Sequence, residues 1–178
     1  IGSLVAANVA ARGLAEEACD SAVERTFPMF VFFVSKLIEL GDTALLVVRG
    51  RPLSTLHVWH HASVMVYCWS AWGVSAPAGS LFALMNSVVH SIMYPYFALQ
   101  SIPHGGARRI KAAARSVSGA ITVLQITQMV AGLVLALATG ACTPPEGILN
   151  NMGAVAMYAS YLILFVRLYV TRAVAADK

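Results

Sequence analysis

Apolar residues gather in five long stretches of the chain, each closed by a short break that is polar or contains glycine and proline. The stretches cover roughly 28–48, 57–75, 80–100, 118–138 and 150–170. Each is close to the length of about 20 residues that a helix needs to cross a bilayer. They show no strand-like alternation, and backbone inside a bilayer is helical unless it closes a barrel. The pattern therefore predicts an all-α, polytopic transmembrane helix bundle with about five spans.

The composition supports a membrane protein and excludes a soluble globular domain. Hydrophobic residues make up 58% of the chain and charged residues 11%, against about 45–50% and about 25% in soluble domains. With so few charges, the chain cannot cover a whole surface with groups that water solvates. The net charge of +4 comes from short basic clusters between the apolar stretches. A lipid bilayer is therefore the expected partner, and nucleic acid is not.

The basic residues fall in alternate breaks, and this gives the bundle an orientation. They follow the first, third and fifth stretches, whereas the other two breaks contain a single charged residue, Glu146. Loops rich in lysine and arginine stay on the cytoplasmic side of a membrane. We therefore expect a cytoplasmic C-terminus. The basic residues concerned are Arg49, Arg51, Arg108, Arg109, Lys111, Arg115, Arg172 and Lys178.

The same pattern divides the chain into three parts. The sequence opens at Ile1 without a methionine or a leader, and we interpret it as a piece of a longer protein. Residues 1–27 would then hold the tail of a truncated span and a non-cytoplasmic, acidic loop. Residues 28–172 would form the membrane domain, and 173–178 a cytoplasmic tail.

Two of the three cysteines, Cys19 and Cys142, fall on the non-cytoplasmic side of the predicted bundle. A compartment on that side permits disulfides, so we predict a Cys19–Cys142 bridge. The third, Cys68, lies inside the second stretch and is expected to pack in the core. No spacing of cysteine and histidine is typical of zinc, and no metal site is predicted.

The first stretch contains charged residues that a bilayer penalises. A charge at the centre of a spanning helix costs about 2.5–3.5 kcal/mol on the insertion scale. At about 100° per residue, Lys36, Glu39 and Asp42 share one arc of about 120° with Thr43. Charged residues inside spans mark functional sites in membrane proteins. The alternative is a charge-paired stripe that only joins helices.

Three further stretches carry polar groups at a similar depth. Asn, Gln and His also join membrane helices through hydrogen bonds, and this stays the alternative for the third and fourth stretches. Because four helices direct polar groups at one layer, we predict a single site built from facing helices. The residues concerned are His57, His60 and His61 in the second stretch, Asn86, His90, Tyr94 and Tyr96 in the third, and Thr122, Gln125 and Gln128 in the fourth.

Four boxes in this order and spacing resemble one family. Across about residues 25–170, the chain is similar to the ELO family of very-long-chain fatty-acid elongases. Each box alone is a weak to moderate signal, but four in order are highly specific. The boxes are Lys36-x-x-Glu39-x-x-Asp42-Thr43, His57-x-x-His60-His61, Asn86-x-x-x-His90-x-x-Met93-Tyr94 and Thr122-x-x-Gln125-x-x-Gln128.

The resemblance implies a seven-span enzyme of the endoplasmic reticulum membrane, of which this chain would lack the first one or two spans. Such enzymes are 3-oxoacyl-CoA synthases: they condense a long-chain acyl-CoA with malonyl-CoA and release CO2 and CoA. This is the first step of fatty-acid elongation, and the resemblance implies no cofactor. A reductase, a dehydratase and a second reductase complete the cycle and are the expected protein partners, and self-association is left open.

The resemblance also implies residue roles. His60 is favoured as the acyl carrier, because a neutral imidazole is nucleophilic and an acyl-imidazole is a reactive acyl donor. The other histidines would orient it and move protons, and Asn86 and Gln125 would donate to an oxyanion. Lys36 would meet the malonyl carboxylate, with Glu39 and Asp42 balancing its charge. Further substrate contacts are expected from Tyr94, Tyr96, Thr122 and Gln128, and contacts to CoA phosphates from Arg108, Arg109 and Lys111.

Two other functions remain open at the level of sequence. An HxxHH box also occurs in di-iron membrane desaturases and hydroxylases, although their sites need about eight histidines and this chain has five. A transporter with a buried proton relay is the second alternative. Acyl chain length and oligomeric state cannot be deduced from the sequence.

Overall fold

The computed structural model describes residues 13–101 and 116–176, and every regular element within them is a helix. Five long helices occupy the five apolar stretches, so the predicted all-α bundle is confirmed. A short helix, α2, precedes them, and two 3-10 turns connect the last two. The elements are α2 (Leu14–Asp20), α3 (Phe27–Val48), α4 (Thr55–Val74), α5 (Gly79–Ser101), α7 (Ser118–Ala138), η1 (Thr139–Ala141), η2 (Pro145–Gly147) and α8 (Ile148–Ala176).

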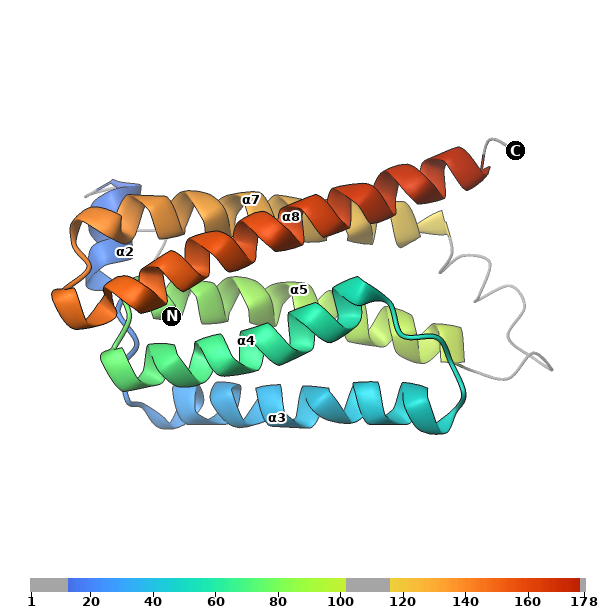
Figure 1. Ribbon diagram of the computed structural model, residues 1–178, viewed down its shortest axis with the longest axis horizontal. Coiled ribbons are helices and arrows are strands. Elements are labelled where there is room, and N and C mark those ends of the chain that lie inside the picture. The colour runs from blue at the N-terminus through green and yellow to red at the C-terminus, as the bar shows by residue number, and fades with distance from the viewer. Residues whose placement is uncertain (1–12, 102–115, 177–178) are drawn as a thin grey trace.

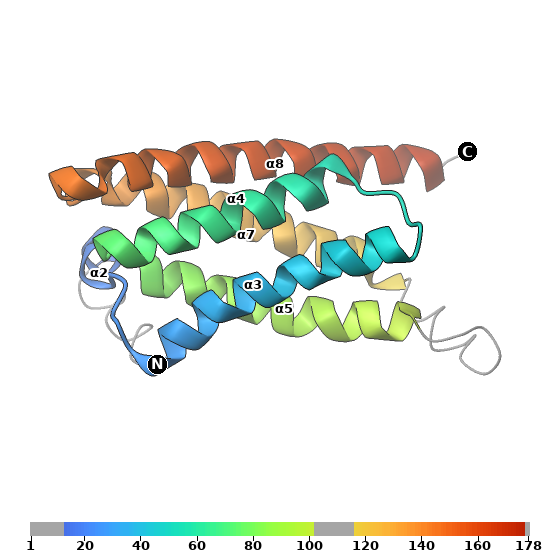
Figure 2. The same ribbon diagram turned by 60° about the horizontal axis from the view of Figure 1, so that its bottom comes forward.

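The five long helices lie side by side along one direction, and α2 sits at one end of the bundle (Figures 1 and 2). Helix α4 packs against α3 and α8, and helix α7 packs against α8 and α5. The order around the bundle is therefore α3, α4, α8, α7, α5. This order makes α3 and α5 neighbours, and the polar site lies between them.

Local signals start and stop the helices that carry the site. Ser54 caps α4, and its Oγ accepts a hydrogen bond from His57 N at 3.1 Å, which is the usual way to satisfy a free amide in the first turn. Pro28 stands in the first turn of α3, where a missing amide hydrogen breaks no helical bond. Helix α4 ends at Ser75, whose φ of 48° is left-handed and turns the chain toward α5.

Helices α7 and α8 approach each other closely. A Cβ atom on Gly132 of α7 would lie 2.2 Å from Cε1 of Tyr158 on α8, so only glycine allows this separation. Small residues serve this purpose in membrane helices, where close van der Waals packing holds the helices together. Tyr158 in turn stacks on Phe82 of α5, with ring centroids 5.3 Å apart.

The outer surface of the bundle is apolar. Two segments are long and apolar enough to cross a membrane: Ser118–Ala141, with a mean hydropathy of 2.0, and Pro145–Val174, with 1.6. The other three long helices carry the polar stripes but still expose large apolar side chains, such as Trp69 at 77% and Val48 at 84%. Water penalises extended apolar patches of this kind whereas lipid solvates them, so the surface fits a polytopic membrane protein.

Covalent and main-chain links tie α2 to the end of the bundle. Cys19 of α2 forms a disulfide with Cys142 after η1, with Cα atoms 6.0 Å apart, which is the pairing expected from the sequence. The amide of Ala78, before α5, donates to Ala18 O at 2.7 Å. Cys68 is buried and lies outside any disulfide, in agreement with a packing role.

Candidate active site

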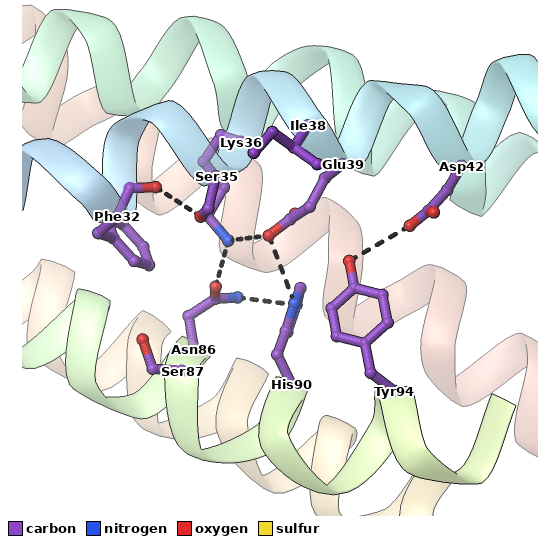
Figure 3. Close-up of a pocket in the computed structure, with 10 residues that line it drawn as sticks. All are labelled: Phe32, Ser35, Lys36, Ile38, Glu39, Asp42, Asn86, Ser87, His90 and Tyr94. Atoms are coloured by element: carbon purple, nitrogen blue, oxygen red, sulfur yellow. Dashed lines mark hydrogen bonds and ion pairs between the residues drawn. The ribbon is translucent and has the colours of Figure 1, made fainter. Parts of the chain in front are cut away.

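Four polar side chains of α3 and α5 form a closed ring of contacts between the two helices (Figure 3). Lys36 and Glu39 lie one turn apart on α3, and Lys36 Nζ donates to Glu39 Oε1 at 2.6 Å. The same ammonium group donates to Asn86 Oδ1 on α5. Asn86 Nδ2 lies 3.2 Å from His90 Nε2, and His90 Nδ1 lies 3.5 Å from Glu39 Oε1. The helical spacing of each pair thus produces a network across two helices.

The ring fixes which nitrogen of His90 carries the proton. Asn86 uses its carbonyl oxygen to accept from Lys36, so its amide group faces His90 as a donor. His90 Nε2 therefore accepts, and Nδ1 carries the hydrogen and directs it toward the carboxylate of Glu39. This arrangement is that of a neutral imidazole with a single tautomer.

The charges in this ring are deeply buried. Lys36 is 2% exposed and Glu39 is 7% exposed, and buried charges of this kind need a partner of opposite sign. The Lys36 ammonium group also lies 4.6 Å from the centre of the Phe32 ring, a cation–π distance. Glu39 Oε2 has no hydrogen-bond partner among the described residues, so one carboxylate oxygen remains free to accept.

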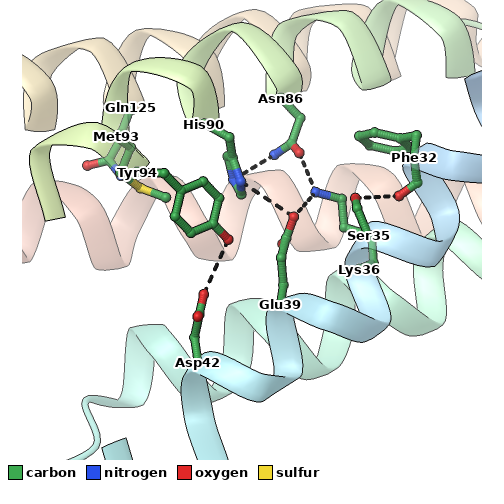
Figure 4. Close-up of polar contacts among 10 residues, drawn as sticks. All are labelled: Phe32, Ser35, Lys36, Glu39, Asp42, Asn86, His90, Met93, Tyr94 and Gln125. Atoms are coloured by element: carbon green, nitrogen blue, oxygen red, sulfur yellow. Dashed lines mark hydrogen bonds and ion pairs between the residues drawn. The ribbon is translucent and has the colours of Figure 1, made fainter. Parts of the chain in front are cut away.

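A pocket of about 290 Å³ opens beside the ring, between α3 and α5. Asp42 and Tyr94 close its far end, where Tyr94 Oη donates to Asp42 Oδ2 at 3.2 Å (Figures 3 and 4). The pocket therefore combines a buried cation, two carboxylates, an amide and an imidazole. Its lining residues are Phe32, Ser35, Lys36, Ile38, Glu39, Asp42, Asn86, Ser87, His90 and Tyr94.

Helix α7 approaches this site at Gln125. Gln125 Nε2 lies 3.2 Å from Sδ of Met93, which precedes Tyr94 on α5 (Figure 4). The thioether of methionine is a weak acceptor, so Gln125 is held near the pocket without lining it.

The three histidines of α4 form a group that is joined to the polar stripe of α3. His57 Nε2 lies 2.9 Å from Thr43 Oγ1, the last residue of the α3 stripe. The rings of His57 and His61 are 4.3 Å apart and those of His60 and His61 are 5.3 Å apart, centre to centre.

His60 has a second neighbour on α8. Its ring packs against that of Tyr161, with centroids 4.8 Å apart at an angle of 45°. Tyr161 Oη lies 2.6 Å from Ser63 Oγ and 3.3 Å from the carbonyl oxygen of His60. Tyr161 is 1% exposed and is one of the two most completely buried large side chains described.

The structure brings together most of the residues that the sequence singled out. Six of them line the pocket: Lys36, Glu39, Asp42, Asn86, His90 and Tyr94. His57, His60 and His61 form the histidine group of α4. Among residues 13–101 and 116–176, no three His, Cys, Asp or Glu side chains come together as ligands of a metal ion.

Other predicted site residues lie elsewhere. Tyr96 contacts Phe97 and lines a separate apolar pocket between α5 and α7. Thr122 Oγ1 donates to Ser118 O of its own helix at 3.1 Å, and Gln128 is buried in α7. The expected CoA-binding residues, Arg108, Arg109 and Lys111, are outside the residues that the structure describes.

Sequence reasoning missed the contribution of α8. Tyr161 of α8 belongs to none of the four boxes, yet it contacts the middle histidine of the second box and is hydrogen-bonded to Ser63 of α4. The available signal was a tyrosine within an apolar helix, because a buried tyrosine hydroxyl usually needs a hydrogen-bond partner. That signal does not say which helix supplies the partner.

These features define a multi-span α-helical membrane protein with a polar, histidine-containing site between its helices. Comparison with known proteins assigns the class further. Residues 3–178 match the family model described as ELO: GNS1/SUR4 family. The chain belongs to this family.

Curated relatives carry elongase names. The chain is 41% identical over 145 residues to fatty acid elongase 3 of Trypanosoma cruzi. This alignment covers 78% of the chain and 46% of that protein. It is 36% identical over 147 residues to human very long chain fatty acid elongase 3, covering 80% of the chain and 52% of that protein. The chain thus spans about half the length of these relatives. No solved structure matches it significantly.

Family membership bears on the functions left open by the sequence. The relatives are named for fatty-acid elongation, so neither a di-iron desaturase nor a transporter is favoured.

Proposed function

We propose that the protein condenses a long-chain acyl-CoA with malonyl-CoA to give 3-oxoacyl-CoA, CO2 and CoA, the first step of fatty-acid elongation. The single observation that carries this proposal is that the polar stripe of α3, which holds the Lys36–Glu39–Asn86–His90 ring, is joined to the α4 histidines by the contact of Thr43 with His57. A condensation of this kind needs a nucleophile that holds the acyl group and donors that stabilise an enolate. The site supplies both from neighbouring helices, in a chain whose relatives are named elongases.

In the first half-reaction, an imidazole nitrogen of His60 attacks the thioester carbonyl of the acyl-CoA. The C–S bond breaks, CoA leaves as a thiolate, and the imidazole proton passes to that thiolate. The product is an acyl-imidazole and free CoA. His57 and His61 lie beside His60 and can carry this proton.

In the second half-reaction, malonyl-CoA loses CO2, and the electron pair of the broken C–C bond forms the enolate of the remaining thioester. The enolate carbon attacks the acyl-imidazole, the C–N bond breaks, and His60 takes up one proton. Asn86 lines the pocket and keeps one amide hydrogen beside the one it gives to His90, so it is the group best placed to direct an N–H at the enolate oxygen. Its hydrogen bond to His90 holds it in place before substrate arrives.

Lys36 is the group proposed to meet the malonyl carboxylate. An ammonium group has three donors, and two of them are directed at Glu39 and Asn86. The third remains for an anionic group in the pocket. Glu39 balances the charge of Lys36 while the site is empty, and loss of CO2 from the substrate removes the anion again.

The proposed setting is the endoplasmic reticulum membrane, with the C-terminus and the CoA substrates on the cytoplasmic side. The alternating basic loops support this orientation. Arg108, Arg109 and Lys111 would meet the CoA phosphates there, and the remaining reductases and dehydratase would act on the product. The reaction as proposed needs no cofactor.

Membranes that carry the complete protein test the proposal directly. Given labelled malonyl-CoA and a panel of acyl-CoAs, they should form 3-oxoacyl-CoA. The His60→Ala variant should lose this activity by about 10³-fold or more, because the nucleophile is gone. The control is Trp69→Leu, which changes an α4 side chain that is 77% exposed and should leave the activity intact. Normal condensation by His60→Ala, or an acyl group mapped to another residue, would refute the assignment.

A further inference from the structure

Tyr161 of α8 touches His60 in two different ways. Its ring packs on the imidazole at 4.8 Å, and its hydroxyl lies 3.3 Å from the main-chain carbonyl oxygen of the same residue. The tyrosine is 1% exposed, so neither lipid nor water competes for these contacts. One side chain thus reaches both the backbone and the ring of the proposed acyl carrier.

The hydrogen-bond directions show that Tyr161 acts as the donor. The hydroxyl of Ser63 donates to the carbonyl oxygen of Trp59, one turn earlier on α4. With its hydrogen used there, Ser63 Oγ can only accept from Tyr161 Oη at 2.6 Å. The tyrosine hydroxyl therefore has one hydrogen to share between Ser63 Oγ and the carbonyl of His60. This sharing fixes α8 against the turn of α4 that carries His60.

The ring of His60 is held by packing rather than by hydrogen bonds. Among the described residues, no side chain or main-chain group is hydrogen-bonded to its ring nitrogens, and its closest aromatic neighbours are Tyr161 and His61. An imidazole held in this way keeps its nucleophilic nitrogen unoccupied. It also depends on its neighbours for its orientation, because no hydrogen bond from the described residues selects a rotamer.

We infer that Tyr161 is a positioning residue that sets the orientation of the His60 ring for acyl transfer. This inference rests on the proposed function of His60. Tyr161 itself touches no substrate in this role: its ring supports one face of the imidazole, and its hydroxyl holds the helix turn behind it. It should therefore affect the formation of the acyl-imidazole and not the binding of malonyl-CoA.

Tyr158 supplies a matched control one turn earlier on the same helix. It is buried to a similar extent, at 6% exposed. Its ring stacks on Phe82 of α5 instead of a histidine, and in the described part of the chain its hydroxyl is not hydrogen-bonded to α4. Removing this hydroxyl changes the same helix core without touching His60.

The test compares variants in membranes that carry the complete protein. Labelled acyl-CoA without malonyl-CoA measures the rate of enzyme acylation, and full turnover measures kcat and the KM for malonyl-CoA. Tyr161→Phe keeps the ring and should slow acylation about fivefold, the effect of one neutral hydrogen bond. Tyr161→Leu also removes the ring and should slow it about 10²-fold, as a misplaced reacting group does. Tyr158→Phe should stay within about twofold of wild type.

Each outcome of this comparison either supports or overturns the inference. If acylation slows while the KM for malonyl-CoA stays constant, Tyr161 positions His60. If acylation is faster in Tyr161→Phe than in Tyr161→Leu, the ring contributes to this role. Wild-type acylation in Tyr161→Phe would overturn the hydroxyl contribution. If the Tyr161→Leu protein does not accumulate in membranes, Ser63→Ala is tested in its place. Acylation at the wild-type rate in both Ser63→Ala and Tyr161→Phe would then overturn the inference. Wild-type protein that condenses without an acyl-histidine would instead refute the mechanism proposed for His60, and the inference with it.

Discussion

The α3–α5 pair and the α7–α8 pair are held together by different forces. Helices α7 and α8 are apolar and approach closely, with Gly132 against the ring of Tyr158. Helices α3 and α5 meet through charged and polar groups around a pocket of about 290 Å³. Both pairs belong to the same bundle and face the same surroundings, so the difference reflects what each pair does.

Buried charged groups, such as those between α3 and α5, are a costly way to join two helices. Removing two charges from water costs several kcal/mol per ion, and apolar residues of similar volume often stabilise a protein as well or better. The α7–α8 pair shows that this chain can build such an apolar contact. The buried Lys36–Glu39 ion pair beside a pocket is therefore better explained by a role in the reaction than by a role in holding helices together. It also contributes contacts between α3 and α5.

Breaking the charge pair should have the largest effect. In Lys36→Met, Glu39 loses its cation while it stays buried, which should lower the free energy of unfolding by about 3–5 kcal/mol. Condensation should disappear as well. Thermal unfolding of the complete protein purified in detergent, together with the malonyl-CoA assay, measures both effects.

The double variant Lys36→Met/Glu39→Gln separates the two roles. It removes both charges, so most of the lost stability should return. Activity should not return, because the proposed cation for malonyl-CoA is still missing. Recovery of activity along with stability would mean that the pair only joins helices.

A change at the apolar contact between α7 and α8 should affect stability and leave activity intact. In Gly132→Ala the new Cβ would lie 2.2 Å from Tyr158 Cε1, and such overpacking costs about 1–3 kcal/mol. Stability should fall, whereas the activity of each folded molecule should persist. Gly153→Ala on α8 is the matched control, since a Cβ there meets no atom within 4 Å. Loss of turnover at unchanged stability in Gly132→Ala would contradict a purely structural role for this contact.

The helices themselves followed from the sequence because apolar runs and their breaks are local signals. The stretch expected at 28–48 is α3 at Phe27–Val48, and the one expected at 118–138 is α7 at Ser118–Ala138. The last helix was placed at 150–170 but continues to Ala176. Its end carries no glycine or proline, so the sequence offered no stop signal.

The site followed from the sequence only within each helix. Helical spacing placed Lys36 with Glu39, and Asn86 with His90, on common faces, and the structure joins the two pairs. Spacing does not show which helices face each other or how each is rotated. For this reason Tyr96, two residues after Tyr94, was assigned to the same site but lies in another pocket.

The smallest effect expected here concerns the link between the two parts of the polar site. Thr43→Val keeps the shape of the side chain but removes the hydroxyl 2.9 Å from His57 Nε2. One neutral hydrogen bond contributes about 1 kcal/mol, so turnover should fall about fivefold while the Lys36–Glu39 pair stays intact. Thr127→Val is the control, because that exposed hydroxyl donates to Val123 O of its own helix. Since Thr43 joins the α3 stripe to the α4 histidines, an unchanged turnover in Thr43→Val would mean that the two groups work without this connection.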